Sequence, residues 1–492
     1  MFAQIVREAG ARYGDRAAYV TPDGSELSYA DLDRLSNDAA VGLRNRGIAE
    51  GSVVALLLPS ATEYIVLYAA LAKLGAVTAG VNPRFTASEK LAVIDRIEPQ
   101  LLIADSVLDA PGDQLVVTIA STPDDALAEL RRSGTIEELT TNPDRAVCIC
   151  FTSGSTGAPK GAWYAEHQLR TISDLDTGGA WGNGGAMIAS TAFAHVGFMT
   201  KVPWMLASGA TMYLQDRWRA ATTLQLIHDH QMKSVSAVAP QIALMLQRPD
   251  FDQFDFATVA AIVAGGAASP PALVTEARER FGAPYSIRYS STESGGIGLG
   301  TALDADDEEA LYTIGRPRPG AEAEVRDENL QPAGPGIVGE LWLKTPTAMS
   351  GYWNDPAETA NTLVDGWLRT GDLATIDDQG LYRLSGRVTE MFIRGGYNVY
   401  PMEVEGVLSG LRGIREVAIV PRPDPVMGEI GVAVVVANGD APSLDDLRSH
   451  AEKELAHYKL PEAIRVVERL PRNSSQKIDR RTLAAVEAEV SD

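Results

Sequence analysis

Residues 151–161 of the chain read Phe151-Thr-Ser-Gly-Ser-Thr-Gly-Ala-Pro-Lys160-Gly161. The apolar run of residues 146–151, Ala-Val-Cys-Ile-Cys-Phe, predicts a buried strand that ends where the glycines begin. Glycine permits positive φ, so successive backbone N–H groups can face one concavity, and neighbouring hydroxyl groups add donors. Lys160 adds a mobile positive charge that suits phosphate oxygens. The residues of this predicted phosphate-binding loop are Thr152, Ser153, Gly154, Ser155, Thr156, Gly157 and Lys160.

Two other interpretations of the loop are weaker. A P-loop requires a Gly-Lys-Ser/Thr ending, whereas this chain has Pro159 before the lysine and Gly161 after it, which disfavours a P-loop NTPase. A flexible Ser/Gly linker is the other interpretation, but such linkers seldom follow an apolar strand directly and seldom contain Pro-Lys-Gly. The phosphate-binding interpretation is therefore preferred.

Length and composition bound the class of protein. A chain of 492 residues predicts two or more domains, and 45% hydrophobic with 22% charged residues is typical of a globular protein. The net charge of -22 argues against broad binding to nucleic acid or anionic membranes. The N-terminus carries charges and no long apolar run, so we expect no leader peptide, no membrane span and a cytoplasmic location. Cys148 and Cys150 are two residues apart on the predicted strand, so they share one face of it and are expected in the core.

Strands and helices alternate along the chain, which predicts an α/β fold. Residues 27–32, Leu-Ser-Tyr-Ala-Asp-Leu, followed by an amphipathic run to Arg46, predict a strand that leads into a capped helix. Further helices are expected at residues 61–74 and 88–97, and strands at residues 53–58, 76–81, 101–104, 186–189, 211–214, 234–238 and 259–263. This order predicts a large N-terminal domain of parallel or mixed sheets with flanking helices. Strands at 321–325 and 340–344, bounded by Pro and Gly, indicate a small β-rich subdomain. Strands at 417–420, 432–436 and 465–467 with a helix at 443–456 predict an α+β domain at the C-terminus.

Further segments carry residues suited to nucleotide chemistry. Residues 287–293, Ile-Arg-Tyr-Ser-Ser-Thr-Glu, end a predicted strand, where ligands of such sheets bind, and Glu293 suits a hard cation such as Mg²⁺. In isolation, Glu293 is better explained as a first-turn residue of a helix capped by Thr292. The short carboxylate of Asp372 can accept hydrogen bonds from two vicinal hydroxyls. The remaining segments are Ser385-Gly-Arg387, residues 391–405 and Leu470-Pro-Arg-Asn-Ser-Ser-Gln476-Lys477.

Together these motifs resemble those of the adenylate-forming superfamily, which includes acyl-CoA synthetases, carrier-protein adenylation domains and luciferases. The resemblance covers nearly the whole chain and implies an N-terminal domain of residues 1–387 and a mobile C-terminal domain of residues 388–492. It implies that Tyr289 stacks on adenine, Thr292 contacts the α-phosphate and Glu293 holds Mg²⁺. It also implies that Asp372 and Arg387 bind ribose.

The resemblance assigns the two half-reactions to the C-terminal domain. Lys477 would bridge the substrate carboxylate, the ribose and the α-phosphate during adenylation. The domain would then rotate about residue 389 and bring in residues 394–397, including Gly395 and Gly396, for the step with coenzyme A. The family usually has Asp or Lys at the hinge and Gly before the lysine, where this chain has Thr389 and Gln476. These departures concern hinge behaviour and the way Lys477 reaches the site.

The acyl pocket is marked by two segments. Phe193-Ala-His195-Val-Gly197 resembles the family segment at the carboxylate end of the substrate, which gives His195 a catalytic position; an ordinary loop histidine is the second interpretation. Residues 264–268 resemble the pocket wall. Small side chains leave room for a bulky or extended apolar acid, and Ala194 weighs against an amino-acid substrate. The predicted pocket residues are Phe193, Gly265, Gly266, Ala267 and Gly295, with Gly296 also contributing space.

The predicted activity is that of an AMP-forming acid:CoA ligase that uses ATP, Mg²⁺ and coenzyme A on a carboxylic acid as its small-molecule substrate. Because the substrate supplies its own nucleophile, the protein has to position the reactants and stabilise charge. Alternatives are a ligase that loads a carrier protein, an enzyme that mainly forms the thioester from an adenylate made elsewhere, and a luciferase-like oxygenase. From another class, a non-catalytic adenylate-binding protein is disfavoured by the retained Lys477, Glu293, Asp372 and Arg387. No nucleic-acid partner and no integral membrane contact are expected.

Overall fold

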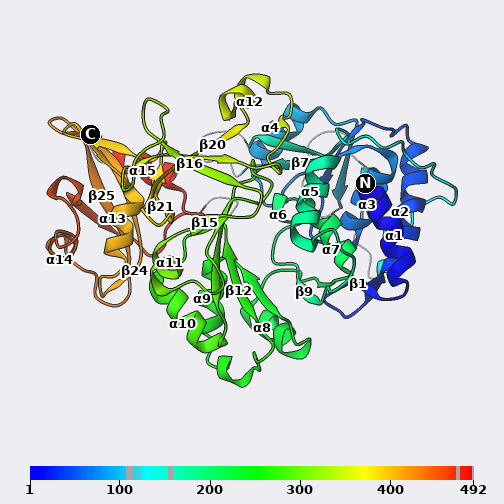
Figure 1. The fold of residues 1–492 in the computed structure, drawn as a ribbon, viewed down its shortest axis with the longest axis horizontal. Coiled ribbons are helices and arrows are strands. Elements are labelled where there is room, and N and C mark those ends of the chain that lie inside the picture. Colours follow the sequence, from blue (N-terminus) through cyan, green and yellow to red (C-terminus); the bar gives the residue numbers. More distant parts are fainter. Residues whose placement is uncertain (107–114, 119–121, 153–158, 473–476, 490–492) are drawn as a thin grey trace. The chain divides into compact units, whose positions relative to one another are not determined.

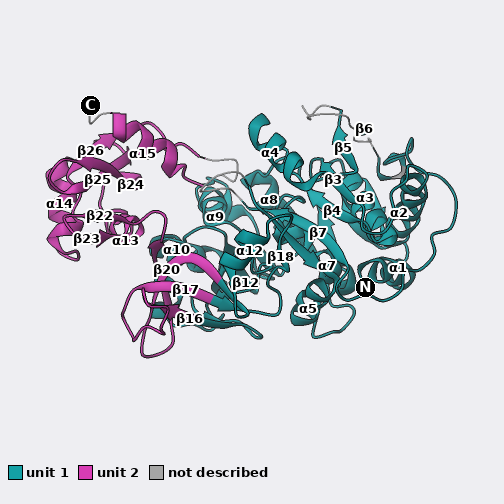
Figure 2. Cartoon of the chain, turned by 90° about the horizontal axis from the view of Figure 1, so that it is seen from above, with its two compact units in different colours: residues 1–154, 158–323, 343–368 teal, residues 155–157, 324–342, 369–492 magenta. Residues whose placement is uncertain are grey.

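The computed structural model describes residues 1–106, 115–118, 122–152, 159–472 and 477–489. The described residues form two compact units (Figure 2). Unit 1 takes those of residues 1–323 and 343–368, and unit 2 takes those of residues 324–342 and 369–492. The domain boundary after Arg387 stays a prediction.

The largest sheet of unit 1 has seven strands (Figure 1). Its order is β18 (Gly351–Tyr352), β8 (Gly161–Ala165), β7 (Ala146–Phe151), β4 (Val77–Gly80), β3 (Val53–Leu57), β5 (Leu101–Asp105) and β6 (Leu115–Val117). The predicted parallel arrangement is confirmed for β7, β4, β3, β5 and β6. The short strands β8 and β18 add an antiparallel edge that the sequence pattern did not predict. Cys148 and Cys150 lie in the core, as expected.

Helix α3 (Thr62–Leu74) lies entirely inside unit 1, with every residue buried. Because it is apolar on almost all sides, it suits a core position rather than the surface. It packs against α2 (Tyr29–Arg44), which begins at the predicted cap, since the Ser28 side chain accepts a hydrogen bond from the Asp31 N–H. The third predicted helix is α4 (Ala87–Ile97), capped by Thr86. Helix α1 (Phe2–Tyr13) and the sheet β2-β1-β10-β9 complete this part; those strands are Glu26–Ser28, Ala17–Val20, Thr211–Tyr213 and Ala186–Ile188.

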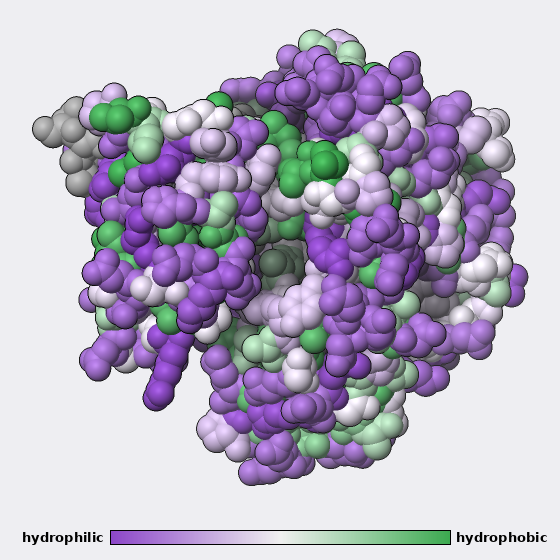
Figure 3. Space-filling model, turned by 60° about the vertical axis from the view of Figure 1, so that its left-hand side comes forward, coloured by the Kyte–Doolittle hydropathy of each residue, from purple (hydrophilic) through white to green (hydrophobic). Residues whose placement is uncertain are grey.

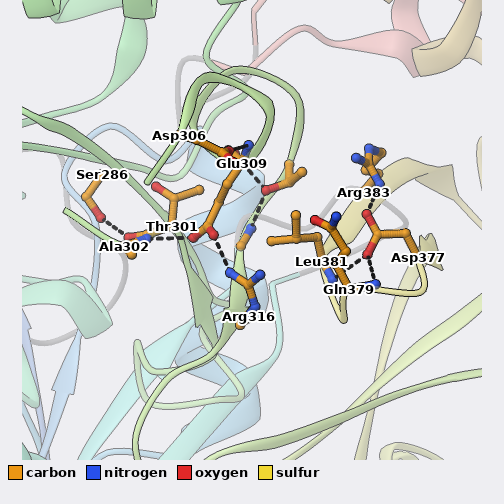
Figure 4. Close-up of polar contacts among 12 residues, drawn as sticks. Ser286, Thr301, Ala302, Asp306, Glu309, Arg316, Asp377, Gln379, Leu381 and Arg383 are labelled. Atoms are coloured by element: carbon orange, nitrogen blue, oxygen red, sulfur yellow. Dashed lines mark hydrogen bonds and ion pairs between the residues drawn. The ribbon is translucent and has the colours of Figure 1, made fainter. Parts of the chain in front are cut away.

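A second large sheet of unit 1 has the order β11 (Ser234–Ala237), β12 (Ala261–Gly265), β13 (Tyr285–Tyr289), β14 (Leu299–Gly300) and β15 (Arg316–Pro317). One apolar core joins Val235, Ile262 and Tyr285 of this sheet to helices α8 (Ala220–Asp229), α9 (Ala239–Leu246) and α10 (Pro271–Phe281). The segment after β14 contains α11 (Asp307–Tyr312). There the Glu309 side chain accepts hydrogen bonds from the Ala302 N–H and from Arg316, which anchors the connection to β15 (Figure 4). The remaining helices of unit 1 are α5 (Glu166–Thr177), α6 (Val196–Met199), α7 (Val202–Ser208) and α12 (Pro356–Thr362).

Residues 322–387 form the predicted β-rich part. Its strand order is β16 (Glu322–Arg326), β17 (Gly339–Lys344), β20 (Trp367–Ile376) and β19 (Leu363–Val364), and β21 (Tyr382–Arg387) pairs with β20. The turn between β20 and β21 is closed by Asp377, whose side chain accepts hydrogen bonds from the Gln379 and Leu381 N–H groups and from Arg383 (Figure 4).

The C-terminal part of unit 2 is the predicted α+β domain. Its sheet has the order β23 (Tyr397–Val399), β22 (Phe392–Arg394), β25 (Gly428–Ala437) and β24 (Ile414–Asp424), with β26 (Ala463–Val466) beside β25. The long hairpin β24–β25 extends well beyond the apolar residues that predicted it. Helix α14 (Leu444–Ala451) begins where predicted, with Ser443 as its N-cap residue, but ends before residue 456, because residues 452–454 turn and bring Leu455 into the core. Helices α13 (Pro401–Leu408) and α15 (Arg480–Glu489) complete it.

Hydrophilic residues predominate on the face drawn in Figure 3, and hydrophobic residues appear there in small separate patches. Among the described residues, no helix has the length and apolar character that crossing a membrane requires.

Candidate active site

The two ends of the predicted phosphate-binding loop lie together in unit 1, where β7 and β8 pair as antiparallel neighbours. The Thr152 N–H donates to the Lys160 carbonyl at 2.9 Å, and the Lys160 N–H donates to the Thr152 hydroxyl at 3.1 Å. These two hydrogen bonds close the base of the loop. Predicted contact residues that lie outside the described residues are Ser153, Gly154, Ser155, Thr156 and Gly157.

The side chain of Lys160 is directed at two residues that the sequence did not single out. Its Nζ lies 2.5 Å from Oε1 of Glu358, on α12, and 5.3 Å from the ring centroid of Tyr352, on β18. Both charged side chains of the ion pair are about one-third exposed, at 32% each. The lysine expected to bind phosphate is therefore held by a carboxylate and an aromatic ring.

The segment Tyr289–Glu293 follows β13 as predicted, but residues 292–296 form turns, so Glu293 does not begin a helix. Two tyrosines hold this turn. Tyr164, on β8, donates its hydroxyl to the Thr292 carbonyl and accepts from the Gly295 N–H at 3.2 Å. Tyr352 donates its hydroxyl to Oε1 of Glu293 at 2.8 Å. Since the pKa of Tyr352 is raised by burial and by the nearby Glu293 carboxylate, its hydroxyl stays a proton donor.

Tyr352 thus joins the two predicted halves of the phosphate site. Its ring faces Lys160 and its hydroxyl binds Glu293, so the loop after β7 and the turn after β13 converge on one side chain. The pairing of β18 with β8 at the edge of the sheet brings these groups together, because it places Tyr352 opposite Ala162 of β8. Tyr352 was not predicted as a site residue because β18 is only two residues long; the local signal that the sequence offers is the Asp355-Pro356 start of α12.

The predicted acyl-pocket residues fall in different surroundings. Phe193 is buried in the core and stacks on Phe198 at a centroid distance of 3.6 Å. His195 is the N-cap residue of α6, and its Nε2 lies 3.1 Å from the amide nitrogen of Asn82. A Cβ at Gly295 would lie 2.3 Å from the Thr347 carbonyl oxygen, so glycine is needed there for close packing. Gly265 is partly buried, whereas Gly266 and Ala267 are exposed.

The two residues predicted to bind ribose lie together in unit 2. Asp372 on β20 is paired in register with Arg387 on β21, and Nε of Arg387 donates to Oδ1 of Asp372 at 2.5 Å. The Asp372 side chain is 15% exposed and that of Arg387 is 37% exposed, so both reach solvent. The Asp372 N–H also donates to the Thr370 hydroxyl, which fixes the strand at this point.

The remaining predicted residues of unit 2 lie in turns and at the surface. Gly395 and Gly396 have φ of 53° and 86° in the turn between β22 and β23. Thr389 is exposed in the turn that follows β21. Lys477 is exposed close to the isolated bridge between Arg472 and Ile478, and Gln476 lies outside the described residues.

Comparison with known proteins identifies the class to which this fold and these motifs belong. The chain matches the model of the AMP-binding enzyme family over residues 6–353 and that of the AMP-binding enzyme C-terminal domain over residues 403–477. The protein is therefore a member of the AMP-binding enzyme family.

Individual relatives are similar over nearly their whole lengths. The fatty acid–acyl-carrier-protein ligase ScoC of Streptomyces coeruleorubidus is 32% identical and is aligned over 94% of this chain and 92% of its own. The long-chain-fatty-acid–CoA ligase FadD13 of Mycobacterium tuberculosis is 30% identical and is aligned over 94% of this chain and 93% of its own. The structure of Bacillus subtilis o-succinylbenzoate coenzyme A synthetase with ATP and magnesium matches with a TM-score of 0.84, at 25% identity over 97% of this chain and 98% of that one.

Proposed function

We propose that the protein is an AMP-forming acyl-CoA synthetase. The substrate carboxylate attacks the α-phosphorus of ATP, the bond to the β-phosphate oxygen breaks, and pyrophosphate leaves. The thiolate of coenzyme A then attacks the acyl carbon of the adenylate and AMP leaves. The observation that carries the proposal is the convergence of Lys160 and Glu293 on Tyr352 at the base of the glycine-rich loop.

Unit 1 supplies groups for the triphosphate and the adenine. Lys160 and the loop from Thr152 onward bind phosphate oxygens, and Tyr289 and Thr292 contact adenine and the α-phosphate. Charge develops on the phosphate oxygens as the carboxylate attacks, and donors fixed in advance stabilise it. The tyrosine hydroxyls that hold the turn give this fixed geometry without a covalent role.

Mg²⁺ fits the donor set at Glu293. Within the described parts of the chain, no three His, Cys, Asp or Glu side chains are grouped as a metal site. Mg²⁺ commonly binds one or two carboxylates together with substrate phosphates and water, so a single half-buried carboxylate suffices. When bound, the ion supplies charge neutralisation at the phosphates. Tyr352 orients the Glu293 carboxylate for that contact through Oε1.

Unit 2 supplies the ribose contacts and the lysine of the adenylation step. The paired Asp372 and Arg387 both reach solvent, where the carboxylate can accept from the ribose hydroxyls. Lys477 stabilises the transition state of adenylation, and Gly395 and Gly396 belong to the segment used with coenzyme A. Residues 388–492 act as the mobile domain with Thr389 as its hinge.

The acid is bulky or extended and largely apolar. A second candidate function, transfer of the acyl group to a carrier-protein thiol, is favoured by the similarity to ScoC. We assign His195, whose Nε2 lies 3.1 Å from the Asn82 amide nitrogen, to the carboxylate end of the acyl pocket. A cytoplasmic location belongs to the same proposal.

The test is a two-part assay with a panel of aliphatic, aromatic and polycyclic acids. Pyrophosphate release with ATP and Mg²⁺ measures adenylation, and mass spectrometry measures acyl-CoA or the acylated pantetheine arm of a carrier protein. Lys477→Ala should lower adenylation by about two to three decades, because it removes one charge-stabilising donor. Lys344→Ala, at a surface lysine paired with Glu322, is the control.

Three results would contradict the proposal. Absence of pyrophosphate release with every acid, but conversion of a supplied acyl-adenylate to acyl-CoA, would define an enzyme of the thioester step alone. Product only with the carrier protein would exclude coenzyme A as the acceptor. Binding of ATP without any product would indicate a non-catalytic protein.

A further inference from the structure

A cluster of charged side chains lies beside the glycines predicted to leave space for the acyl chain in unit 1. This cationic cluster consists of Lys201, Arg288, Arg318 and Asp176. Lys201 is the N-cap residue of α7, and Arg288 lies on β13 directly before Tyr289. Arg318 follows β15, and Asp176 lies at the end of α5. Four separate elements therefore bring these charges together.

The cluster contains more positive than negative charge. Nζ of Lys201 lies 2.7 Å from Oδ2 of Asp176, and Arg318 lies 3.7 Å from Oδ1 of the same residue. Among the described residues, Asp176 is the only carboxylate within ion-pair distance of Lys201 or Arg318, and Arg288 has none. Three positive side chains with one negative side chain leave an excess of two positive charges. The side chains of Lys201, Asp176 and Arg318 are only 15%, 17% and 27% exposed.

Arg288 is held in place by the strand beside it. Its guanidinium donates to the Thr301 carbonyl at 3.1 Å. The same carbonyl accepts from the Ser286 hydroxyl at 2.7 Å, and this second bond is drawn in Figure 4. The pKa of Arg288 is lowered, first by burial and then by the positive charge of Arg318, and the negative charge of Asp176 opposes this shift. Partial burial of like charges is unfavourable, and a bound anion would relieve it.

The cationic cluster borders the predicted pocket at Gly296 and Gly265, and it is tied to the segment after them through Gly298. A Cβ at Gly296 would lie 3.9 Å from Cε of Lys201. Gly265 is paired in register with Arg288, and the Arg318 N–H donates to the Gly298 carbonyl at 2.9 Å.

The pleat of the sheet sets the side on which Arg288 lies. Ile262 and Ala264 of β12 belong to the core beneath α8, α9 and α10. Since side chains alternate along a strand, Gly265 and its partner Arg288 lie on the opposite face of the sheet. A group bound on that face beside Gly265 and Gly296 would meet the cationic cluster.

We propose that the cationic cluster binds a second carboxylate of the acid, so that the enzyme activates an acid with an apolar body and two carboxylates. This inference rests on the proposed function, whose acyl pocket it completes. A cluster with an excess of positive charge selects for an anionic partner, while a purely apolar chain would leave the positive charge that Asp176 does not balance without a counter-charge.

The experiment compares monocarboxylic acids with α,ω-dicarboxylic acids of equal carbon number, from octanoic and octanedioic acid upward. The readouts are kcat and KM for acyl-CoA formation by the full-length enzyme. We expect the dicarboxylic acid to have the higher kcat/KM. Lys201→Met keeps the length of the side chain but removes its charge, so it should raise KM for the dicarboxylic acid and lower its advantage about ten- to hundredfold.

Arg318→Gln provides an independent variant should Lys201→Met fail to fold, and Lys344→Met is the matched control, with the advantage of the dicarboxylic acid unchanged. If the wild-type enzyme converts monocarboxylic acids and both variants leave the ratio of the two acids unchanged, the cationic cluster has only a structural role and the inference is overturned. If the wild-type enzyme converts neither kind of acid, the proposed function itself is overturned.

Discussion

Tyr352 shows how one side chain can organise a site whose parts lie far apart in the sequence. Its hydroxyl orients Glu293 and its ring lies beneath Lys160. The prediction is that Tyr352→Phe keeps the ring contact but frees the Glu293 carboxylate. Hydrogen bonds to charged groups contribute about 1.5–3 kcal/mol, so pyrophosphate release should fall roughly ten- to hundredfold.

The measurement is pyrophosphate release as a function of Mg²⁺ concentration. Tyr352→Phe should need more Mg²⁺ for half-maximal activity, whereas Tyr312→Phe, at a residue 56% exposed, should not. An unchanged Mg²⁺ dependence in Tyr352→Phe would contradict the role assigned to this hydroxyl.

For the ion pair between Lys160 and Glu358 we expect a substitution to strengthen ATP binding, in contrast to the loss of activity expected for Tyr352→Phe. ATP must compete with Glu358 for the lysine, so Glu358→Gln should lower KM for ATP. Partly exposed ion pairs contribute about 0–1 kcal/mol, so the decrease should not exceed roughly fivefold. Steady-state kinetics with varied ATP checks this, and Glu322→Gln, at a surface ion pair with Lys344, is the control. A higher KM in Glu358→Gln would mean that the glutamate positions the lysine for ATP instead of competing with it.

At the scale of elements, α2 and α3 are joined by an ion pair whose lysine is buried. Lys73 of α3 is 1% exposed, and its Nζ lies 2.6 Å from the Asp33 carboxylate of α2. Burial lowers the pKa of Lys73, and the charge of Asp33 opposes that shift. The same Nζ also donates to the Asp33 main-chain carbonyl at 2.6 Å, so removing the carboxylate leaves the buried charge with a neutral acceptor but without its counter-charge, which is more costly than removing both charged groups.

Asp33→Ala should therefore lower the free energy of unfolding by about 2–4 kcal/mol, and the double variant with Lys73→Met should recover most of that loss. Chemical denaturation of the two variants measures the difference. Arg34→Ala is the control: the Arg34 side chain is 53% exposed and forms an ion pair with Asp31, so its loss should change the free energy of unfolding by less than about 1 kcal/mol. Equal losses in the single and double variants would show that burial of the lysine charge is not the cause.

The elements that the sequence predicted well are those with strong local patterns. The apolar run of β7, the Ser28 cap of α2 and the apolar surface of α3 identify these elements without any tertiary contact. Strands β8 and β18 were missed because pairing with a neighbour defines them, and β18 has two residues. The predicted ribose pair was brought together by the β20–β21 register, which the sequence did not specify. The partners of Lys160 and Glu293 were missed for the same reason, since Tyr352 and Glu358 come from that unpredicted edge and the helix that follows it.

At the scale of the whole molecule, the proposed mechanism requires the C-terminal domain to move between two half-reactions. The hinge is expected at Thr389, in a turn where the Glu390 N–H donates to the Arg387 carbonyl at 3.1 Å. The turn is exposed at Thr389, and the Val388 N–H donates to the Gly371 carbonyl on one side of it. The Met391 N–H also donates to the Arg387 carbonyl at 3.1 Å, so a change of backbone angles at residue 389 has to break two hydrogen bonds of this exposed turn.

Thr389→Pro should separate the half-reactions, because proline fixes φ at this residue and restricts Val388 before it. Adenylation with Lys477 should stay within about threefold of the wild-type rate, while acyl-CoA formation should fall at least about tenfold, since conformational steps limit many such enzymes. Thr389→Asp, which restores the residue usual in the family, should keep both rates. Single-turnover measurement of acyl-adenylate formation and decay distinguishes the steps. A parallel loss of both half-reactions in Thr389→Pro would indicate damage to the turn, and normal rates of both would place the hinge elsewhere.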